Sequence, residues 1–574
     1  MSNRVFFPYG ISNFEKIVRE NLVFVDKTNY LPLLENYSNI AFLRPRRFGK
    51  SLFVSLLEHY YDMNRKEKFQ ELFGKYYIGK NPTPLANAYR ILFFNFSGIN
   101  TETEEKSRAG FISNIKSALE EFFIKYALFD RTLQQEILNH SETSEILSHF
   151  FRKYAAFYKE PIYLLIDEYD HFTNEILIRD LQEFKETVSL NGYVRKFYEA
   201  IKNATQQGVV DRFFITGVSP ITLDSLTSGF NIVRHLTHEK DFEAMMGFTE
   251  SEVRDLLGLV LQDKRQEEAV LNDMRRYYNG YRFYPSSQEN IYNSDMVLYF
   301  LDHFKQQQQY PRQMLDPNIA PDYGKLKAMF EVANWQENIK VLEEVLEKGY
   351  VDTQLILQFN FEKYFGKKEF INFLFYLGNL TIQETDITGT ILFKIPNQVI
   401  AELYWQYYAE ILQEQANLHT EADLVLSAVR EMAISGKATI FFGLVQKLLQ
   451  HLSNRDFIRF DEKHIKMVLM AYFIQSNIFW VQSEREISGG GYVDLELFIR
   501  PNNPFKHHQF AIELKYLKKE ETHLLQNTMQ EAKEQILHYY QQDTLLKSKE
   551  QLHLLAVVVV KDEIFVEEVK IQIV

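Results

Sequence analysis

The sequence predicts a multidomain α/β protein with a parallel sheet near its N-terminus, a helical middle region and a smaller C-terminal α/β domain. Its 574 residues correspond to several domains at about 150 residues each. Between residues 40 and 217, short apolar runs alternate with amphipathic segments, as in parallel sheets connected by helices. Helical periodicity dominates from residue 242, and alternation returns after residue 454. We therefore expect domains over residues 1–240, 241–450 and 451–574.

Each predicted element follows from such a local pattern. Apolar runs predict strands of the N-terminal sheet over 40–43, 91–96, 162–166 and 212–216. In the middle region, periodicity predicts helices over 251–261, 267–278 and 338–347, and polar composition predicts loops over 284–290 and 306–313 and a proline-containing linker over 310–322. For the C-terminal domain we predict helices over 461–474 and 520–541, strands over 478–481, 493–499, 509–514 and 552–560, and a turn at 489–491.

Composition excludes several kinds of chemistry. The sequence has no cysteine, which excludes disulfides, thiolate zinc sites, iron–sulfur clusters and a cysteine nucleophile. Any metal ion must be held by carboxylate, imidazole or main-chain oxygen. The 64 basic and 77 acidic residues leave a net charge of −13, which argues against a generally basic nucleic-acid-binding surface. A nucleic-acid site would have to be a local basic patch.

Hydrophobic patterning bears on location. No apolar run approaches the roughly 18 residues that a membrane span needs. The N-terminal segment also lacks the apolar stretch of a cleavable secretory signal. We therefore expect no membrane insertion and a cytoplasmic location.

Residues 39–57 combine an apolar strand, a tight loop and an amphipathic helix. Gly49, Lys50 and Ser51 stand where the loop meets the helix, and there free N–H groups and the helix dipole attract phosphate. Lys50 is expected to reach phosphate oxygens and Ser51 to ligate Mg²⁺. The segment resembles a Walker A motif in which Arg44 replaces the first glycine.

Arg46, Arg47 and Phe48 complete the loop and are expected beside the phosphates. The arginines at positions 44, 46 and 47 have two interpretations. They clamp phosphate or stabilise the transition state, or they contact acidic residues of their own domain. A Gly-Lys-Ser tripeptide also occurs by chance, so a basic surface turn is the alternative to a phosphate site.

A second segment favours the phosphate site. Asp167 and Glu168 follow the predicted strand 162–166, where Asp167 can hold the Mg²⁺ shell and Glu168 can orient an attacking water. Thr216 ends a further predicted strand, at the place of a sensor for the terminal phosphate, and Ser219 is the alternative. Together the motifs predict a site for phosphate groups and Mg²⁺.

The C-terminal domain contains a different set of charged residues on predicted strands. Glu513 and Lys515 project from one face of their strand because side chains alternate, and such charges are costly to bury unless they are paired or metal-bound. Asp494 on the preceding strand would complete a site of hard oxygen ligands for a divalent cation. This looks like the core of the PD-(D/E)xK nuclease superfamily. The alternative is a simple ion pair between Glu513 and Lys515.

Flanking residues add to this pattern. Gln535 and Tyr539 are spaced to share one face of the predicted helix 520–541, which resembles the Gln-x-x-x-Tyr motif of that superfamily. Glu462 is the candidate for the acidic residue of the first core helix, and His464 and Glu484 are rivals for that role.

Several strings together resemble the bacterial predicted AAA-ATPase-like family, whose members commonly carry a C-terminal PD-(D/E)xK nuclease-like domain. They are FPYGISNF at 7–14, FVDKT at 24–28, RPRRFGKS at 44–51 and LIDEYD at 165–170. The resemblance covers residues 5–300 and 455–565, and it also accounts for the missing glycine, since the family's loop typically reads this way. It implies a P-loop NTPase sheet and a restriction-endonuclease-like C-terminal domain.

The resemblance also implies residue roles. Phosphate binding is assigned to Lys50, Mg²⁺ to Ser51 and Asp167, and water activation to Glu168. A nuclease metal, Mg²⁺ or Mn²⁺, is assigned to Asp494 and Glu513, with Lys515 as the third member of the nuclease site.

The leading hypothesis is therefore an ATP-regulated, metal-dependent nuclease that acts on nucleic acid, with DNA as the expected substrate. One alternative is a non-catalytic, nucleotide-dependent switch or scaffold in which the nuclease fold serves for binding. Another is an ATPase that acts mechanically on a partner. The helical middle region is a candidate for self-association or a protein partner. The aromatic stretch 277–283 is either a base-stacking surface or a packed turn.

Overall fold

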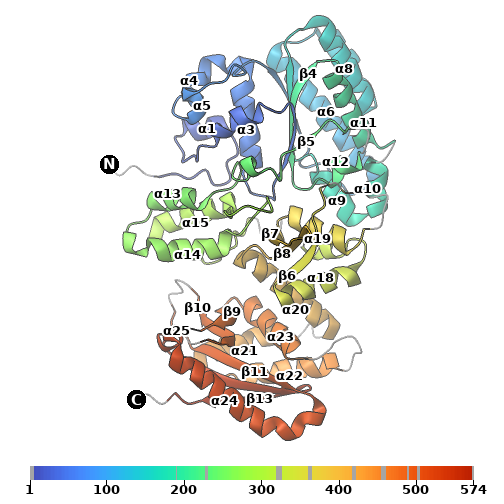
Figure 1. Ribbon diagram of the computed structural model, residues 1–574. Coiled ribbons are helices and arrows are strands. Elements are labelled where there is room, and N and C mark those ends of the chain that lie inside the picture. Colours follow the sequence, from blue (N-terminus) through green and yellow to red (C-terminus); the bar gives the residue numbers. More distant parts are fainter. Residues whose placement is uncertain are drawn as a thin grey trace. The chain divides into compact units, whose positions relative to one another are not determined.

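The computed structural model describes residues 5–571 except 189–190, 227–229, 319–325, 358, 360–364, 417–421, 454–460, 488–489 and 501–504. The chain forms two compact units, one of residues 1–341 and 350–399 and the other of residues 342–349 and 400–574. Each is described by itself (Figure 1). The boundaries predicted after residues 240 and 450 stay predictions. Parts of the predicted linker 310–322 and of the turn at 489–491 lie outside the described residues.

The first unit contains a parallel sheet with the strand order β2-β3-β4-β1-β5. Its strands are β1 Asn39–Leu43, β2 Arg90–Asn95, β3 Ile162–Asp167, β4 Val210–Gly217 and β5 Arg234–His235. The predicted strands agree with β1 to β4 within one or two residues, whereas the short β5 was not predicted. Because β4 pairs with both β1 and β3, the loop after β1 and the carboxylates after β3 meet at one edge of the sheet.

Helices cover both faces of this sheet, and Figure 1 shows α3 on one face and α8 and α11 on the other. The helices of this part are α1 Phe14–Arg19, α2 Leu31–Leu34, α3 Lys50–Tyr61, α4 Phe69–Phe73, α5 Tyr77–Lys80, α6 Glu104–Tyr126, α7 Arg131–Leu138, α8 Thr143–Phe157, α9 His171–Arg179, α10 Leu181–Val188, α11 Tyr193–Gln206 and α12 Ile221–Ser225. The strands between them are almost entirely buried, as expected for a parallel sheet covered on both faces.

The predicted helical middle region begins in this unit. Its helices are α13 Glu250–Gly258, α14 Glu267–Tyr278, α15 Ser294–Gln307, α17 Leu326–Phe330, α18 Trp335–Lys348 and α19 Lys367–Tyr376. A small antiparallel sheet that the sequence did not predict has the order β6-β8-β7, with β6 Tyr350–Gln354, β7 Thr381–Thr385 and β8 Thr390–Lys394. These strands are short and carry mixed polar residues, so they lack the apolar runs that mark the larger sheets.

The aromatic stretch 277–283 lies inside this unit. Tyr277, Tyr278, Tyr281 and Phe283 are all buried. The structure therefore supports the packed-turn interpretation, and the base-stacking interpretation is wrong because these rings are not accessible.

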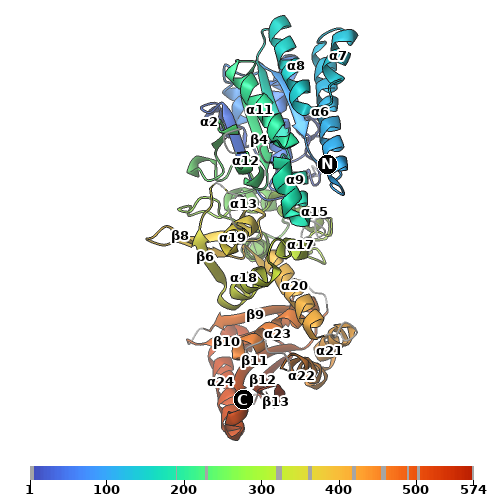
Figure 2. The same ribbon diagram turned by 90° about the vertical axis from the view of Figure 1, so that its right-hand side faces the viewer.

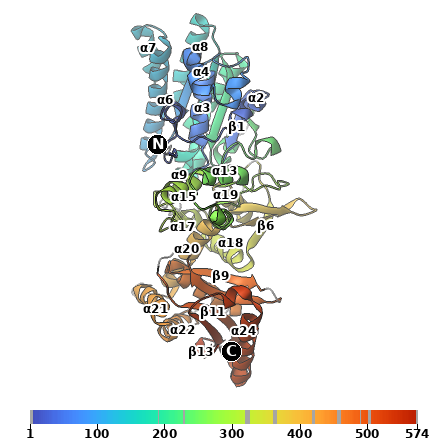
Figure 3. The ribbon, with the colours of Figure 1, turned by 90° about the vertical axis from the view of Figure 1, so that its left-hand side faces the viewer.

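The second unit is built on a mixed sheet with the order β13-β12-β11-β10-β9. Its strands are β9 Phe479–Glu486, β10 Tyr492–Ile499, β11 Gln509–Leu517, β12 Leu552–Val560 and β13 Glu563–Val569. Its helices are α20 Gln398–Ala416, α21 Ala422–Ser435, α22 Thr439–Ser453, α23 Glu462–Gln475, α24 Leu525–Gln542 and α25 Thr544–Lys547, with a 3₁₀ turn at Lys519–Leu524. Figures 2 and 3 show α24 on one face of the sheet and α21 and α22 on the other.

Across the described ranges, no helix combines the length and the apolar character that crossing a bilayer would require.

Candidate active sites

The loop between β1 and α3 has the geometry that a phosphate cradle needs. Gly49 adopts φ +88°, a left-handed conformation that suits glycine, and caps the N-terminus of α3. Lys50 is buried, and its Nζ donates to the carbonyl oxygens of Arg44 at 3.0 Å and Pro45 at 2.9 Å. Burial lowers the pKa of Lys50, and the carboxylates of Asp167 and Glu168 oppose this shift. The ammonium is therefore held inside the loop, at the N-terminus of a helix.

The start of α15 holds the other side of this loop. Ser294 Oγ donates to the carbonyl oxygen of Arg47 at 3.1 Å, and Asn293 Nδ2 donates to that of Arg46 at 3.3 Å. The Phe48 side chain is buried against Tyr281, with ring centroids 5.0 Å apart. The Phe48 ring thus anchors the loop.

Arg44 is buried and stabilises the fold around the loop. Its guanidinium donates to four carbonyl oxygens, those of Leu43, Thr237, Phe242 and Glu243. The side chain is 1% exposed, and burial lowers its pKa to about 10. The phosphate-clamp interpretation is therefore wrong for Arg44, because the side chain is buried and both terminal nitrogens already donate to carbonyl groups of the fold. These contacts are with carbonyls, and not with acidic side chains as the alternative supposed.

The carboxylates after β3 face the same loop. Asp167 is 1% exposed and forms a hydrogen bond with Ser51. Burial raises the pKa of Asp167, and the bond to Ser51 opposes the rise. Glu168 follows in a left-handed conformation, φ +50°, and its N–H donates to Asp167 Oδ1 at 2.9 Å. The turn separates the two carboxylates, with Asp167 beside Ser51 and Glu168 in the cavity wall.

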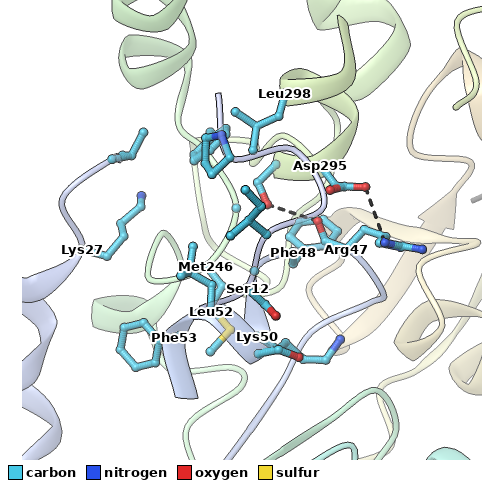
Figure 4. A pocket seen from close by; sticks show the side chains of 18 of the residues that line it. Ser12, Lys27, Arg47, Phe48, Lys50, Leu52, Phe53, Met246, Asp295 and Leu298 are labelled. Carbon is cyan, nitrogen blue, oxygen red and sulfur yellow. Dashed lines mark hydrogen bonds and ion pairs between the residues drawn. The ribbon is translucent and has the colours of Figure 1, made fainter. Parts of the chain in front are cut away.

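A cavity of about 410 Å³ opens beside the loop (Figure 4). Its wall contains Arg46, Arg47, Phe48, Gly49, Lys50, Ser51 and Glu168, together with apolar residues from the N-terminal segment and the middle region such as Ile11, Phe24, Met246 and Leu298. Its size is within the usual range of small-molecule sites. A smaller cavity of about 60 Å³ shares Arg46, Arg47, Lys50 and Glu168.

Thr216 stands apart from the residues in these walls. It is buried at the end of β4, opposite Phe42 of β1, and its Oγ1 has no hydrogen-bond partner among the described residues. Ser219 Oγ instead donates to Asn174 Oδ1 at 3.0 Å, which leaves Thr216 as the better candidate for a sensor.

In the second unit, β10 and β11 separate at the predicted charged residues. The strands pair from Leu495 opposite Ile512 to Leu497 opposite Phe510, and the next step of this register sets Asp494 opposite Glu513. Asp494 Oδ2 accepts from the Leu514 N–H at 2.8 Å. The Asp494 carboxylate thus takes the place of a ladder partner where the strands diverge.

Glu513 is the most unusual group at this point. It is 1% exposed; its Oε1 accepts from Lys515 Nζ at 2.7 Å, but its Oε2 has no hydrogen-bond partner among the described residues. Burial raises the pKa of Glu513 to about 7, and the Asp494 carboxylate adds to the rise. A buried carboxylate oxygen without a donor is costly, and a cation would satisfy it.

The candidate supporting residues of the nuclease site lie on two helices, α23 and α24. Glu462 begins α23, and burial raises its pKa, with the Asp494 charge as the next cause. Its rival His464 is bonded to Asp461, 2.8 Å from Nδ1 to Oδ1. On α24, Gln535 Nε2 donates to the Tyr539 hydroxyl at 2.7 Å. No three Asp, Glu or His side chains within the described ranges form a ready-made metal cluster.

Comparison with known proteins addresses both regions. Residues 8–227 match the family model described as Predicted AAA-ATPase, and residues 460–569 match that of the PD-(D/E)XK nuclease superfamily. Two family models thus match separate regions of the chain, which we call the AAA-ATPase region and the nuclease region. This confirms the resemblance stated from the sequence motifs.

Two individual proteins are also similar. An uncharacterized protein in the vnfD 5′ region of Azotobacter chroococcum mcd 1 is 27% identical over 296 residues, which are 51% of this chain and 51% of that protein. The chain thus spans about half the length of this curated relative. The Walker-type ATPase PABY2304 of Pyrococcus abyssi has 12% identity and a TM-score of 0.38, over 70% of this chain and 98% of its own.

Within the AAA-ATPase region, sequence reasoning missed the role of Asp170. This buried carboxylate accepts from the N–H groups of Val218 at 3.0 Å and Ser219 at 2.7 Å and from Asn174 Nδ2 at 2.6 Å. It joins the loop after β4 to α9. Its place three residues after Asp167 could have indicated a role near the phosphate loop, but the sequence did not show which hydrogen-bond donors Asp170 would meet.

We expect Asp170→Ala to lower the free energy of unfolding of the AAA-ATPase region by about 3 kcal/mol, because buried donors lose their acceptor. Urea and thermal unfolding measure the change. Glu121→Ala, at an exposed position on α6, is the control and should shift stability by less than about 0.5 kcal/mol. Equal stability of the two variants would contradict the structural role of Asp170.

Proposed function

We propose that this protein binds and hydrolyses ATP and that its nucleotide state gates a metal-dependent phosphodiesterase acting on nucleic acid, with DNA as the substrate. The two family matches support the pairing of an ATPase with a nuclease. The observation that carries the nuclease activity is the buried Glu513 Oε2, which lacks a donor among the described residues and lies beside Asp494 and Lys515.

The ATPase proposal rests on the loop and the cavity beside it. Lys50 and the N–H groups at the start of α3 would hold the phosphates, and Arg46 and Arg47 line both cavities at that end. Ser51 and Asp167 already contact each other and would share a Mg²⁺ ion. Glu168 would accept a proton from, and orient, the attacking water.

The nuclease residues fit a divalent cation. Mg²⁺ keeps several waters and usually takes only one or two protein carboxylates, which matches Asp494 and Glu513. When bound, such an ion polarises a phosphodiester and activates water. Lys515, paired with Glu513, would hold the attacking water or a phosphate oxygen. Gln535 and Tyr539 would support the site from α24.

Chain connectivity supports the proposed coupling of nucleotide state to nuclease activity. The chain passes from one unit to the other at residues 341–342, 349–350 and 399–400. A change in the ATPase unit therefore has covalent paths to the nuclease unit.

The test is cleavage of plasmid, linear and single-stranded DNA and of RNA by the purified protein, with Mg²⁺ or Mn²⁺ and with or without ATP. Cleavage that requires ATP and disappears in Asp494→Ala would support the proposal. If ATP is bound but no substrate is cut in any nucleotide state, the switch or scaffold function would replace it.

The proposed ATP site also predicts a pH dependence. Asp295 lies in the cavity wall, and burial raises its pKa to about 6. The positive charge of Arg47, whose Nη1 lies 3.9 Å from Asp295 Oδ2, opposes this rise. Between pH 5 and 7.5 this carboxyl loses its proton and places a negative charge near the polyphosphate. We expect ATP affinity to fall several-fold over this range, on the order of 1 kcal/mol.

Isothermal titration calorimetry of the wild type and Asp295→Asn measures this effect. Ionisation of ATP itself contributes equally to both proteins, so the ratio of their affinities isolates Asp295. A ratio that does not change with pH would contradict the prediction.

A further inference from the structure

Three acidic residues occupy corresponding register positions on neighbouring strands in the sheet of the nuclease unit. In the pairing of β9 with β10, Arg485 lies opposite Val493 and Ser483 opposite Leu495, so the position between them sets Glu484 opposite Asp494. On the other side, the register of β10 and β11 sets Glu513 opposite Asp494. Asp494 is therefore flanked by an acidic residue on each neighbouring strand.

Glu484 does not continue its strand regularly. It adopts a left-handed conformation, φ +50°, which changes the direction of its side chain. Its Oε1 lies 2.5 Å from Nζ of Lys466, which comes from α23 one turn after Glu462. The Lys466 side chain is 13% exposed, although that of Glu484 is 64% exposed.

Lys466 interacts with three of the acidic residues Glu462, Glu484, Asp494 and Glu513, which we call the acidic group. Its ammonium bonds to Glu484, and its charge also lowers the pKa of Asp494 and of Glu462 against the larger effect of burial. Lys515 has the corresponding relation to Glu513. Both lysines thus act on Asp494 and Glu462, and each is in addition paired with one carboxylate, Lys466 with Glu484 and Lys515 with Glu513.

The charges of the group limit what else it can bind. Glu462, Glu484, Asp494 and Glu513 carry four negative charges when ionised, and Lys466 and Lys515 carry two positive charges. A single divalent cation would neutralise the remainder. A second one would have to displace the Lys466 ammonium from the Glu484 carboxylate.

We propose that Lys466 takes the place of a second divalent cation, so that the nuclease site binds one metal ion through Asp494 and Glu513 where two-metal nucleases bind two. Lys466 is a positioning residue in this arrangement, because it holds Glu484 beside Asp494. The inference rests on the proposed nuclease function.

The experiment counts bound Mn²⁺ by electron paramagnetic resonance in the full chain, without nucleotide or nucleic acid. The value for Asp494→Ala is subtracted from that of each protein, which removes ions bound at the ATPase site. We expect one ion for the wild type and two for Lys466→Met. Adding Glu484→Gln to Lys466→Met should return the count to one, because the extra ion would use Glu484.

Two controls test the charge argument. Lys466→Arg keeps the positive charge and should bind one ion. Lys463→Met removes a lysine of the same helix that is 59% exposed and pairs with Glu347, and it should also bind one ion. Circular dichroism and the thermal midpoint establish that each variant is folded.

The outcomes separate this inference from the proposed function. Two ions in the wild type, or one ion in folded Lys466→Met, would overturn the role of Lys466 and leave the nuclease proposal standing. No difference between the wild type and Asp494→Ala would overturn both. If Lys466→Met does not fold, Lys466→Gln takes its place, and one ion in folded Lys466→Gln would overturn the role of Lys466.

Discussion

Glu513→Gln will bind ATP as the wild type does but will cleave nucleic acid at least about a thousandfold more slowly. Glutamine preserves the shape of the buried side chain but removes the negative charge on which a divalent cation depends. It also deprives Lys515 of its ionised partner at 2.7 Å. Single-turnover cleavage of labelled DNA with Mg²⁺ measures the rate, and titration calorimetry measures ATP binding.

The chain offers a matched control for this variant. Glu531 begins another Glu-x-Lys sequence, but it lies at an exposed position on α24. Glu531→Gln should retain the wild-type cleavage rate. Cleavage by Glu513→Gln within tenfold of the wild-type rate would refute the assignment of the metal to this carboxylate.

Glu168→Gln will reduce ATP turnover by about a hundred- to thousandfold while ATP still binds. The amide cannot accept a proton from the attacking water, and general-base contributions are of this size. Binding persists because Lys50, Ser51 and Asp167 are unchanged. Phosphate release at saturating ATP measures turnover.

Glu175→Gln is the control for Glu168→Gln. Glu175 lines the smaller cavity on α9 but has no proposed role in hydrolysis. If both variants lose turnover to the same extent, the effect belongs to the charge of the cavity and not to a base at Glu168. If Glu168→Gln keeps more than a tenth of the turnover, the base is another group.

If the nucleotide gates the nuclease, Glu168→Gln should also change DNA cleavage. A variant that holds ATP without hydrolysing it would show continuous cleavage if the ATP-bound state is the active one. It would show none after preincubation with ATP if hydrolysis is required. Either result differs from the unchanged cleavage expected of an uncoupled pair of enzymes.

Local sequence was enough to predict the strands that carry the candidate sites. Apolar runs placed β1, β3 and β4 within two residues. Gly49-Lys50-Ser51 follows β1 after a five-residue loop, and Asp167-Glu168 stands at the end of β3. The predicted strands also contain Asp494 on β10 and Glu513 on β11. Regular strands bury apolar residues, so the local pattern of apolar residues in the sequence predicts where the strands lie.

The small sheet β6-β8-β7 was not predicted because its strands are short and only partly apolar. The contacts of Arg44 were not predicted because they depend on the tertiary structure. Its position in a phosphate loop suggested either a clamp or a contact with acidic residues, but its four carbonyl acceptors include ones supplied by residues 237–243, which only the fold brings near.

The sequence by itself therefore determined the longer strands that carry the candidate sites, the phosphate-loop motif and the acidic residues of the nuclease region. Only the tertiary structure decided which of these groups are desolvated and which partners they meet. It left Glu513 Oε2 without a donor among the described residues, and it placed Lys466 against Glu484. Burial and electrostatic pairing depend on groups contributed by separate elements, and a linear pattern does not contain that information.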